Sequence, residues 1–183
     1  MSRFDELSRL YAEERHEWWN YRGECAAFAR DVRQAIVRDL GFPPDCVCFA
    51  HADGADEKPG TRPTAFGVQS FEDDGYCEFP MQLTLHNGNA NTFPRCVHRL
   101  RLRVQKRGES FFVKLYSEAT PIEASRQPGD LKKITDGVFE LMRESHNGTL
   151  GQYLSGMQPG KSRIGFSFEA LVEGSEEADQ SVR

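Results

Sequence analysis

Short catalytic signatures are absent from the sequence. It contains no GxSxG, GxxxxGKS/T, HExxH or GxGxxG, the patterns typical of hydrolase nucleophiles, phosphate-binding loops, zinc proteases and dinucleotide sites. Its five histidines and five cysteines make a chance Cys–His neighbour common, so composition alone supports no nucleophilic mechanism. The sequence therefore identifies no catalytic residue and no cofactor, and it favours a non-catalytic protein.

Long apolar runs and an excess of positive charge are also lacking. No segment approaches the roughly 20 apolar residues of a membrane span, and the N-terminal segment MSRFDELSRLYAEERHEWW lacks the apolar core of a secretory signal. The formal net charge is −5, whereas general binders of nucleic acids or membrane surfaces are normally basic. We therefore expect no membrane contact, and the charge argues against nucleic acid as a partner.

Cysteine is scarce and odd in number, which excludes a fully paired disulfide framework. The five cysteines are Cys25, Cys46, Cys48, Cys77 and Cys96, and most lie in apolar, strand-like stretches. Free thiols in the reducing cytoplasm explain this pattern better than a secreted fold does. We therefore expect a cytoplasmic protein.

Two short pairs of potential metal ligands follow a strand period. Cys46-x-Cys48 is one pair and Cys96-x-His98 is the other, and each would place two ligands on one strand face. Structural zinc sites more often use CxxC, however, and the second pair continues an apolar face. An acidic stretch at residues 51–57, HADGADE, lacks the calcium-loop pattern. We therefore expect buried thiols and a solvated loop, with no bound metal.

Residues 3–40 carry apolar side chains in a heptad rhythm, which predicts a long helix. The stripe comprises Phe4, Leu7, Tyr11, Trp18, Tyr21, Cys25, Phe28, Val32 and Ala35, with Glu14 as its one polar position. The sequence GFPP at residues 41–44 should end the helix. Unbroken, it would be roughly 57 Å long, whereas a ten-residue strand spans about 33 Å. The helix should therefore bend between Asn20 and Gly23 or overhang its sheet, and a straight helix predicts a homodimer.

After the prolines the apolar period changes to two, which predicts strands. They are expected at residues 46–51, 64–71, 76–86 and 163–171, with a hairpin over residues 96–118. Pro80 removes a hydrogen-bond donor, so its strand should be an edge or contain a bulge. Residues 119–130 should form a loop, residues 130–145 a helix that His146-Asn147-Gly148 ends, and residues 150–154 a short helical turn.

These elements predict an α+β fold. An antiparallel sheet of five or six strands should be packed on one face by the long N-terminal helix and the C-terminal helix. One domain should span residues 1–172, and the acidic tail, residues 173–183, should be disordered.

Apolar and charged side chains alternate along the hairpin. A two-residue Arg107-Gly108 loop fixes the register by counting outward. Leu102 then lies opposite Val113 on the face that the helices cover. We expect the charged side chains on the opposite face, away from the helices.

Arg99, Arg101 and Arg103 fall on that charged face, and the register places Arg101 opposite Lys114. Like charges directly across a ladder are destabilising, typically by up to about 1 kcal/mol. A negative group should therefore relieve this pair.

Two explanations remain open for how the repulsion between Arg101 and Lys114 is reduced. In one, water and the nearby acids Glu78 and Glu118 screen the charges on a solvated face. In the other, an anionic ligand or an acidic protein partner lies across the sheet, and Phe112 and Tyr116 stack on it. Arginines interleaved with aromatic side chains suit phosphate and carboxylate groups.

The sequence supports two functions. The first is a cytoplasmic interaction or chaperone-like protein, a homodimer that binds a protein partner through its long helix or an acidic partner through the arginine-lined sheet face. The alternative is a small-molecule or nucleotide-binding protein, or an enzyme, that uses the same face. Trp19 cannot fully share the face of Trp18, which indicates either an interface or a wide apolar face covering both rings. The candidate binding residues are Arg99, Arg101, Arg103, Lys114, Tyr116, His86 and Trp19.

Overall fold

The computed structural model describes residues 2–51, 63–86, 95–116, 118–154 and 165–169. Its helices are α1 (Arg3–Leu40), α2 (Ala65–Val68) and α3 (Pro128–Leu154), with a 3₁₀ turn at Pro44–Cys46. Its strands are β1 (Val47–Phe49), β2 (Ser70–Phe71), β3 (Cys77–Leu85), β4 (Arg95–Arg107), β5 (Ser110–Lys114), β6 (Ile122–Ala124) and β7 (Gly165–Glu169). The expected tail and the acidic part of the HADGADE loop lie outside the described residues.

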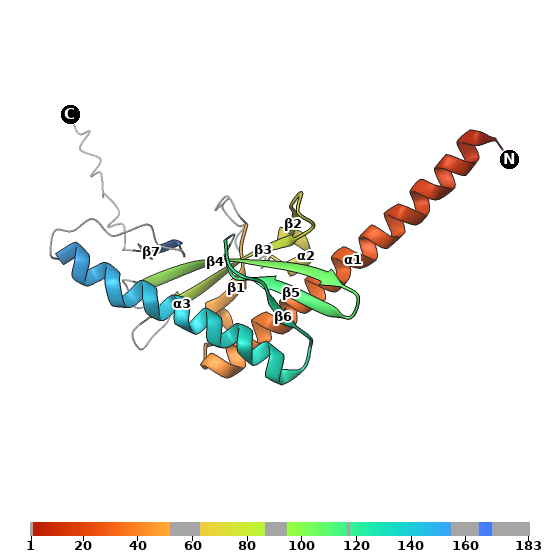
Figure 1. Ribbon diagram of the computed structural model, residues 1–183. Coiled ribbons are helices and arrows are strands. Elements are labelled where there is room, and N and C mark those ends of the chain that lie inside the picture. The colour runs from red at the N-terminus through yellow and green to blue at the C-terminus, as the bar shows by residue number, and fades with distance from the viewer. Residues whose placement is uncertain (1, 52–62, 87–94, 117, 155–164, 170–183) are drawn as a thin grey trace, which may run out of the picture.

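All the described strands join one antiparallel sheet, which confirms the α+β class. The continuous path runs β1-β3-β4-β5-β6, while β2 pairs with β3 and β7 pairs with β4. Helix α3 and the C-terminal half of α1 cover one face of this sheet (Figure 1). The core between them is built from α1, the alternate residues of β3, β4 and β5, and α3, and its fully buried side chains include Phe28, Ile36, Phe79, Met81, Leu83, Leu100, Leu102 and Ile134.

Helix α1 is continuous over its 38 residues, so the predicted bend between Asn20 and Gly23 does not occur. Ser2 and Asp5 form a capping box at its start, and Gly41 ends it in the left-handed conformation at φ 70°. Its buried residues begin at Cys25, whereas every residue from Ser2 to Asn20 is exposed. The alternative expectation is therefore confirmed: the helix overhangs the sheet and projects from the body as a straight rod (Figure 1).

Three predicted elements differ from the structure. Residues 64–71 do not form one strand, because the Thr64 hydroxyl accepts a hydrogen bond from the Gly67 amide and caps the short helix α2 before β2 begins. The expected loop over residues 119–130 contains β6, which pairs with β5. Helix α3 continues through His146-Asn147-Gly148, because one internal glycine costs a helix only about 1 kcal/mol.

The hairpin register is shifted by two residues from the prediction. Its loop is Gly108-Glu109 rather than Arg107-Gly108, with Gly108 at φ 58°, as at the first position of a type II′ turn. Val104 therefore lies opposite Val113, so the predicted pairing of Leu102 with Val113 is wrong. A shift of two residues leaves every side chain on its predicted face. Leu102 is accordingly fully buried, as expected.

Strand β3 is not an edge of the sheet, although it contains Pro80. It pairs with β4 along its whole length, and on its other side β2 pairs with Cys77 and Glu78 while β1 pairs with residues 81–83. Pro80 therefore lies in the gap between these two partners, where only its carbonyl is engaged, by the Ala50 amide. A missing donor costs little at that position.

Candidate functional site

Arg103, one of the three predicted binding arginines, lies buried on the face of the sheet that the helices leave uncovered. Its guanidinium donates two hydrogen bonds to the Asp74 carboxylate, both at 3.0 Å, and lies 5.3 Å from the centre of the Tyr76 ring. Only 7% of Arg103 is exposed. Asp74 comes from the turn between β2 and β3, which Gly75 at φ 80° allows to fold tightly over the sheet.

A like-charge pair does exist in the hairpin, but it joins Arg103 and Lys114 rather than Arg101 and Lys114. The Lys114 ammonium lies 4.8 Å from the centre of the same Tyr76 ring. The pair is therefore relieved by a carboxylate and an aromatic face that the chain itself supplies. The prediction that Arg103 lies on an open face is wrong, since the Asp74 turn covers it.

Arg99 and Arg101 remain exposed on this face. Arg101 keeps 64% of its side chain accessible and makes one long ion pair, at 3.8 Å, with the buried Glu78. Its cross-strand neighbour is Pro80, which carries no charge. These two arginines are therefore the part of the predicted anion-binding face that stays accessible to a partner.

The other candidate residues are dispersed. Tyr116 is half-buried and packs against the core cluster. His86 follows β3 at the end of the sheet opposite the Arg103–Asp74 pair, and its buried Nδ1 has no hydrogen-bond partner among the described residues. Trp19 lies on α1, where its ring stacks on Phe66 of α2. The structure thus brings Arg103 and Lys114 together, and it joins none of these three residues to that pair.

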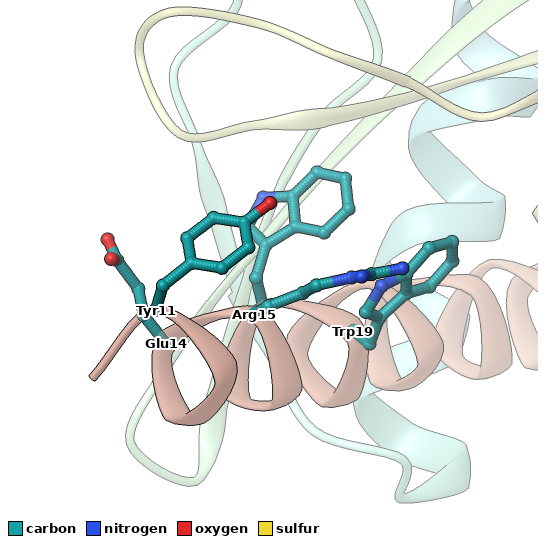
Figure 2. Close-up of a pocket in the computed structure, with 5 residues that line it drawn as sticks. Tyr11, Glu14, Arg15 and Trp19 are labelled. Carbon is teal, nitrogen blue, oxygen red and sulfur yellow. The ribbon is translucent and has the colours of Figure 1, made fainter. Parts of the chain in front are cut away.

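The N-terminal half of α1, residues 3–20, is a second exposed surface, which we call the overhang. Six large apolar side chains lie exposed on it: Phe4, Leu7, Leu10, Tyr11, Trp18 and Trp19. Phe4 is 75% exposed and Tyr11 is 65% exposed. Tyr11, Arg15 and Trp19 rise from the same side of the helix, and with Glu14 and Trp18 they line a shallow hollow (Figure 2). The overhang therefore presents apolar side chains to solvent at both of its ends, over residues 4–11 and at Trp18 and Trp19, with polar residues 13–17 between them.

An aromatic cluster joins the overhang to the body. Trp18 contacts Phe71 edge-on at 6.1 Å, and Trp19 stacks on Phe66 at 5.6 Å. The Arg22 guanidinium lies within about 5 Å of both tryptophan rings and of Phe66. Trp18 is still 38% exposed and Trp19 41% exposed, so the described part of the domain does not fully cover either ring. The cluster fixes the direction in which α1 leaves the domain.

A third site lies under the sheet, where β4 meets α3. Cys96 Sγ is 3.5 Å from His98 Nε2, which is 3.0 Å from His146 Nε2. Burial, and then electrostatic repulsion from the neighbouring His146, lower the pKa of His98 to about 4, so the imidazole of His98 is neutral at neutral pH. Burial raises the pKa of the Cys96 thiol. The sequence analysis found the Cys96–His98 pair but missed His146, because 48 residues separate the two histidines.

Three further findings concern the cysteines, the helices and the comparison with known proteins. All five cysteines are free thiols. Within the described part of the chain, no helix combines the length and the apolar character that crossing a bilayer requires. Comparison of the chain with protein-family models, curated proteins and solved structures found no match. The function must therefore be inferred from these three sites alone.

Proposed function

We propose that the protein is a non-catalytic, cytoplasmic interaction protein that forms a homodimer through the overhang of α1. The observation that carries this proposal is the exposed apolar stripe, interrupted by polar residues at positions 13–17, on a straight helix beyond the edge of the sheet. Leaving a large apolar side chain in water forgoes roughly 1.5–3 kcal/mol relative to its burial. Six such side chains on one short segment favour a surface that a partner covers.

Helix physics supports the same proposal. The overhang contains 18 residues, about 27 Å of helix at 1.5 Å per residue. Isolated helices shorter than about 12–15 residues are only marginally stable in water, and the overhang is not much longer than that. Most of the stability of helices in proteins comes from tertiary packing. Among the described residues, the ring contacts between the overhang and the body lie at the base of the overhang, with Phe66 and Phe71. A second helix lying along it would supply the missing contacts.

A second copy of this chain is the occupant that the overhang fits best. Its stripe has the heptad spacing of helices that pair with one another. Three arginines and five acidic side chains lie on residues 3–20, so the overhang carries a net charge of only −2 and the repulsion between two copies is weak at physiological salt. A two-fold axis across the stripe would make the surface self-complementary, which is the commonest arrangement among oligomers.

The test is the solution mass of the full chain, measured by light scattering over a range of concentrations. We expect a dimer, at twice the chain mass of 20.8 kDa. Tyr11→Glu places a charge in the stripe and should shift the mass to that of a monomer. Asn20→Glu is the matched control, because Asn20 is also exposed and lies nine residues from Tyr11, which places it on the opposite side of the same helix. A wild-type monomer, or equal dissociation by both substitutions, contradicts the proposal.

The exposed arginines support a second function, the binding of an acidic protein partner on the sheet. Arg99 and Arg101 stay accessible after Arg103 has paired with Asp74. A polyglutamate peptide is a suitable probe, and each charge-assisted hydrogen bond to it would contribute about 1.5–3 kcal/mol. The double variant Arg99→Gln/Arg101→Gln should therefore weaken binding at least about tenfold, while the exposed control Arg143→Gln on α3 should not.

Two results of that titration speak against an acidic protein as the partner. Equal affinity in wild type and in the double variant removes the arginine face as the binding surface. Saturable binding of a nucleotide in place of the peptide, lost in the same double variant, assigns the face to the alternative function of a small-molecule site.

A further inference from the structure

Cys96, His98 and His146 bring three metal-binding atoms together from two elements. Cys96 and His98 lie two residues apart on the helix-facing side of β4, and His146 reaches them from α3. One thiol sulfur and two imidazole nitrogens lie within 4.8 Å of one another. Among the described residues this is the one group of three or more such side chains with that proximity.

The distances between these atoms resemble those of a tetrahedral zinc site. With Zn–N bonds of about 2.05 Å and Zn–S bonds of about 2.3 Å, two nitrogen ligands lie about 3.3 Å apart, and nitrogen and sulfur lie about 3.6 Å apart. The observed separations are 3.0 Å between the two Nε2 atoms and 3.5 Å between Cys96 Sγ and His98 Nε2. The three ligand atoms span up to 4.8 Å, so His146, which is exposed and whose ring contacts that of His98, must move nearer to the sulfur when the metal binds.

The surroundings orient His98 for coordination through Nε2. The Ser145 hydroxyl donates to the Met142 carbonyl at 2.7 Å, and its oxygen lies 3.5 Å from His98 Nδ1. Because the hydroxyl proton is directed at Met142, the Ser145 oxygen can accept a proton from Nδ1. The lone pair of Nε2 then points toward Cys96 and His146. An outer hydrogen bond of this kind is the usual companion of a histidine ligand.

We propose that Cys96 Sγ, His98 Nε2 and His146 Nε2 form a zinc-binding site that joins β4 to α3. One thiolate and two imidazoles match the ligand preference of Zn²⁺, and water completes the tetrahedron. Coordination releases the thiol proton of Cys96 to solvent. The proton that His146 Nε2 donates to His98 in the free chain also leaves Nε2 for solvent, and the neutral His146 ring then carries its one proton on Nδ1. Two metal–nitrogen bonds thereby replace the hydrogen bond between the two histidines. The ion would bind the folded chain and not the unfolded one, so it should raise the melting temperature.

Cobalt(II) is the probe, because it occupies zinc sites and reports its ligands by absorption. Titration of the full chain with Co²⁺ should saturate at one equivalent, with a thiolate-to-cobalt charge-transfer band and the intense visible bands of tetrahedral cobalt. Addition of Zn²⁺ should abolish these bands. The same Zn²⁺ should raise the melting temperature of the wild-type chain.

Two pairs of variants test the assignment of ligands. His146→Ala should weaken Co²⁺ binding at least about tenfold and remove the Zn²⁺ thermal shift, and its fold should persist because His146 is exposed. Cys96→Ser should abolish the charge-transfer band. The controls His16→Ala, on the exposed side of α1, and Cys48→Ser, on β1, should leave both signals unchanged.

Several outcomes overturn the proposal. One is the absence of stoichiometric Co²⁺ binding to the reduced wild-type chain. Another is binding that survives in both His146→Ala and Cys96→Ser, which would place the ion elsewhere. A third is loss of the cobalt bands in a control variant to the same degree as in His146→Ala.

Discussion

The two halves of α1 share one helix and one apolar rhythm but have opposite environments. The C-terminal half buries Phe28, Val32 and Ile36 against the sheet, with alanines at positions between them. The overhang carries larger apolar side chains on average, including two tryptophans, and leaves them exposed. Side-chain hydrophobicity therefore does not decide which half is buried; the reach of the sheet does. A stripe that continues past its own sheet indicates a surface for something outside the fold.

The largest expected difference between the halves is in stability. Phe28 is fully buried and its ring stacks on Phe111 at 4.1 Å. Phe28→Ala should therefore lower the free energy of unfolding by about 3–5 kcal/mol. Phe4→Ala, on the overhang, should change the free energy of unfolding of the monomer by no more than about 0.5 kcal/mol while weakening the proposed dimer. Urea unfolding at concentrations low enough to dissociate the dimer measures both, and similar losses in the two variants would break the comparison.

A smaller difference is expected between two neighbouring arginines of β4. Arg103→Gln removes the two hydrogen bonds that one guanidinium nitrogen donates to Asp74 and should cost about 1.5–3 kcal/mol, the usual range for hydrogen bonds to charged groups. Arg101→Gln removes one long, exposed ion pair and should cost less than about 1 kcal/mol. Urea unfolding of each single variant checks this order. Equal effects would mean that the Asp74 turn does not hold Arg103.

The junction between the halves should behave as an intermediate case. Trp19 is 41% exposed and stacks on Phe66. Trp19→Ala should therefore lower the free energy of unfolding by about 0.5–1.5 kcal/mol for the lost aromatic pair, in addition to a small contribution from the lost buried area. Thermal unfolding of Trp19→Ala beside Tyr11→Ala measures this, because Tyr11 lies further out on the overhang. A larger loss for Tyr11→Ala would place the junction further from the body.

The smallest effect concerns the start of α3 in acid. The Lys133 ammonium, and then the Ser125 hydroxyl and amide, lower the pKa of Asp130 to about 2. The unfolded value is about 3.9, so this stabilisation is present above that pH and is lost as the pH falls toward 2. The melting temperature of Asp130→Asn should therefore approach that of wild type across this window. If the difference in melting temperature between wild type and Asp130→Asn is the same at pH 2 and at pH 6, the pKa of Asp130 is not lowered in this way.

The sequence predicted the sheet face of each side chain better than it predicted which residues lie opposite each other on neighbouring strands. Alternation in β4 placed Leu102 inside and Arg101 outside correctly, because a two-residue shift preserves the face of each side chain. The register itself depended on which residues form the turn, and Gly108 permits either loop. The covering of Arg103 by Asp74 could not be read from periodicity, since the turn before β3 contains adjacent acids at Glu72, Asp73 and Asp74 and only one of them reaches the guanidinium.

Contacts between residues that are far apart in the sequence were the other feature that could not be predicted. His146 joins Cys96 and His98 only because α3 crosses beneath β4, and no spacing rule links ligands 48 residues apart. The overhang was predictable for the opposite reason. Its length follows from a rise of 1.5 Å per residue, and the expected sheet was visibly too short to cover it.

Backbone hydrogen exchange of the overhang tests the central claim most directly. If a second copy of the chain covers residues 3–20, peptides between Leu7 and Trp18 should be protected from exchange at high protein concentration and should lose that protection on dilution. The peptide around Phe28 should stay protected throughout, because it lies in the core of each chain. Exchange between Leu7 and Trp18 at the rate of an unfolded peptide, at every concentration, would contradict the account.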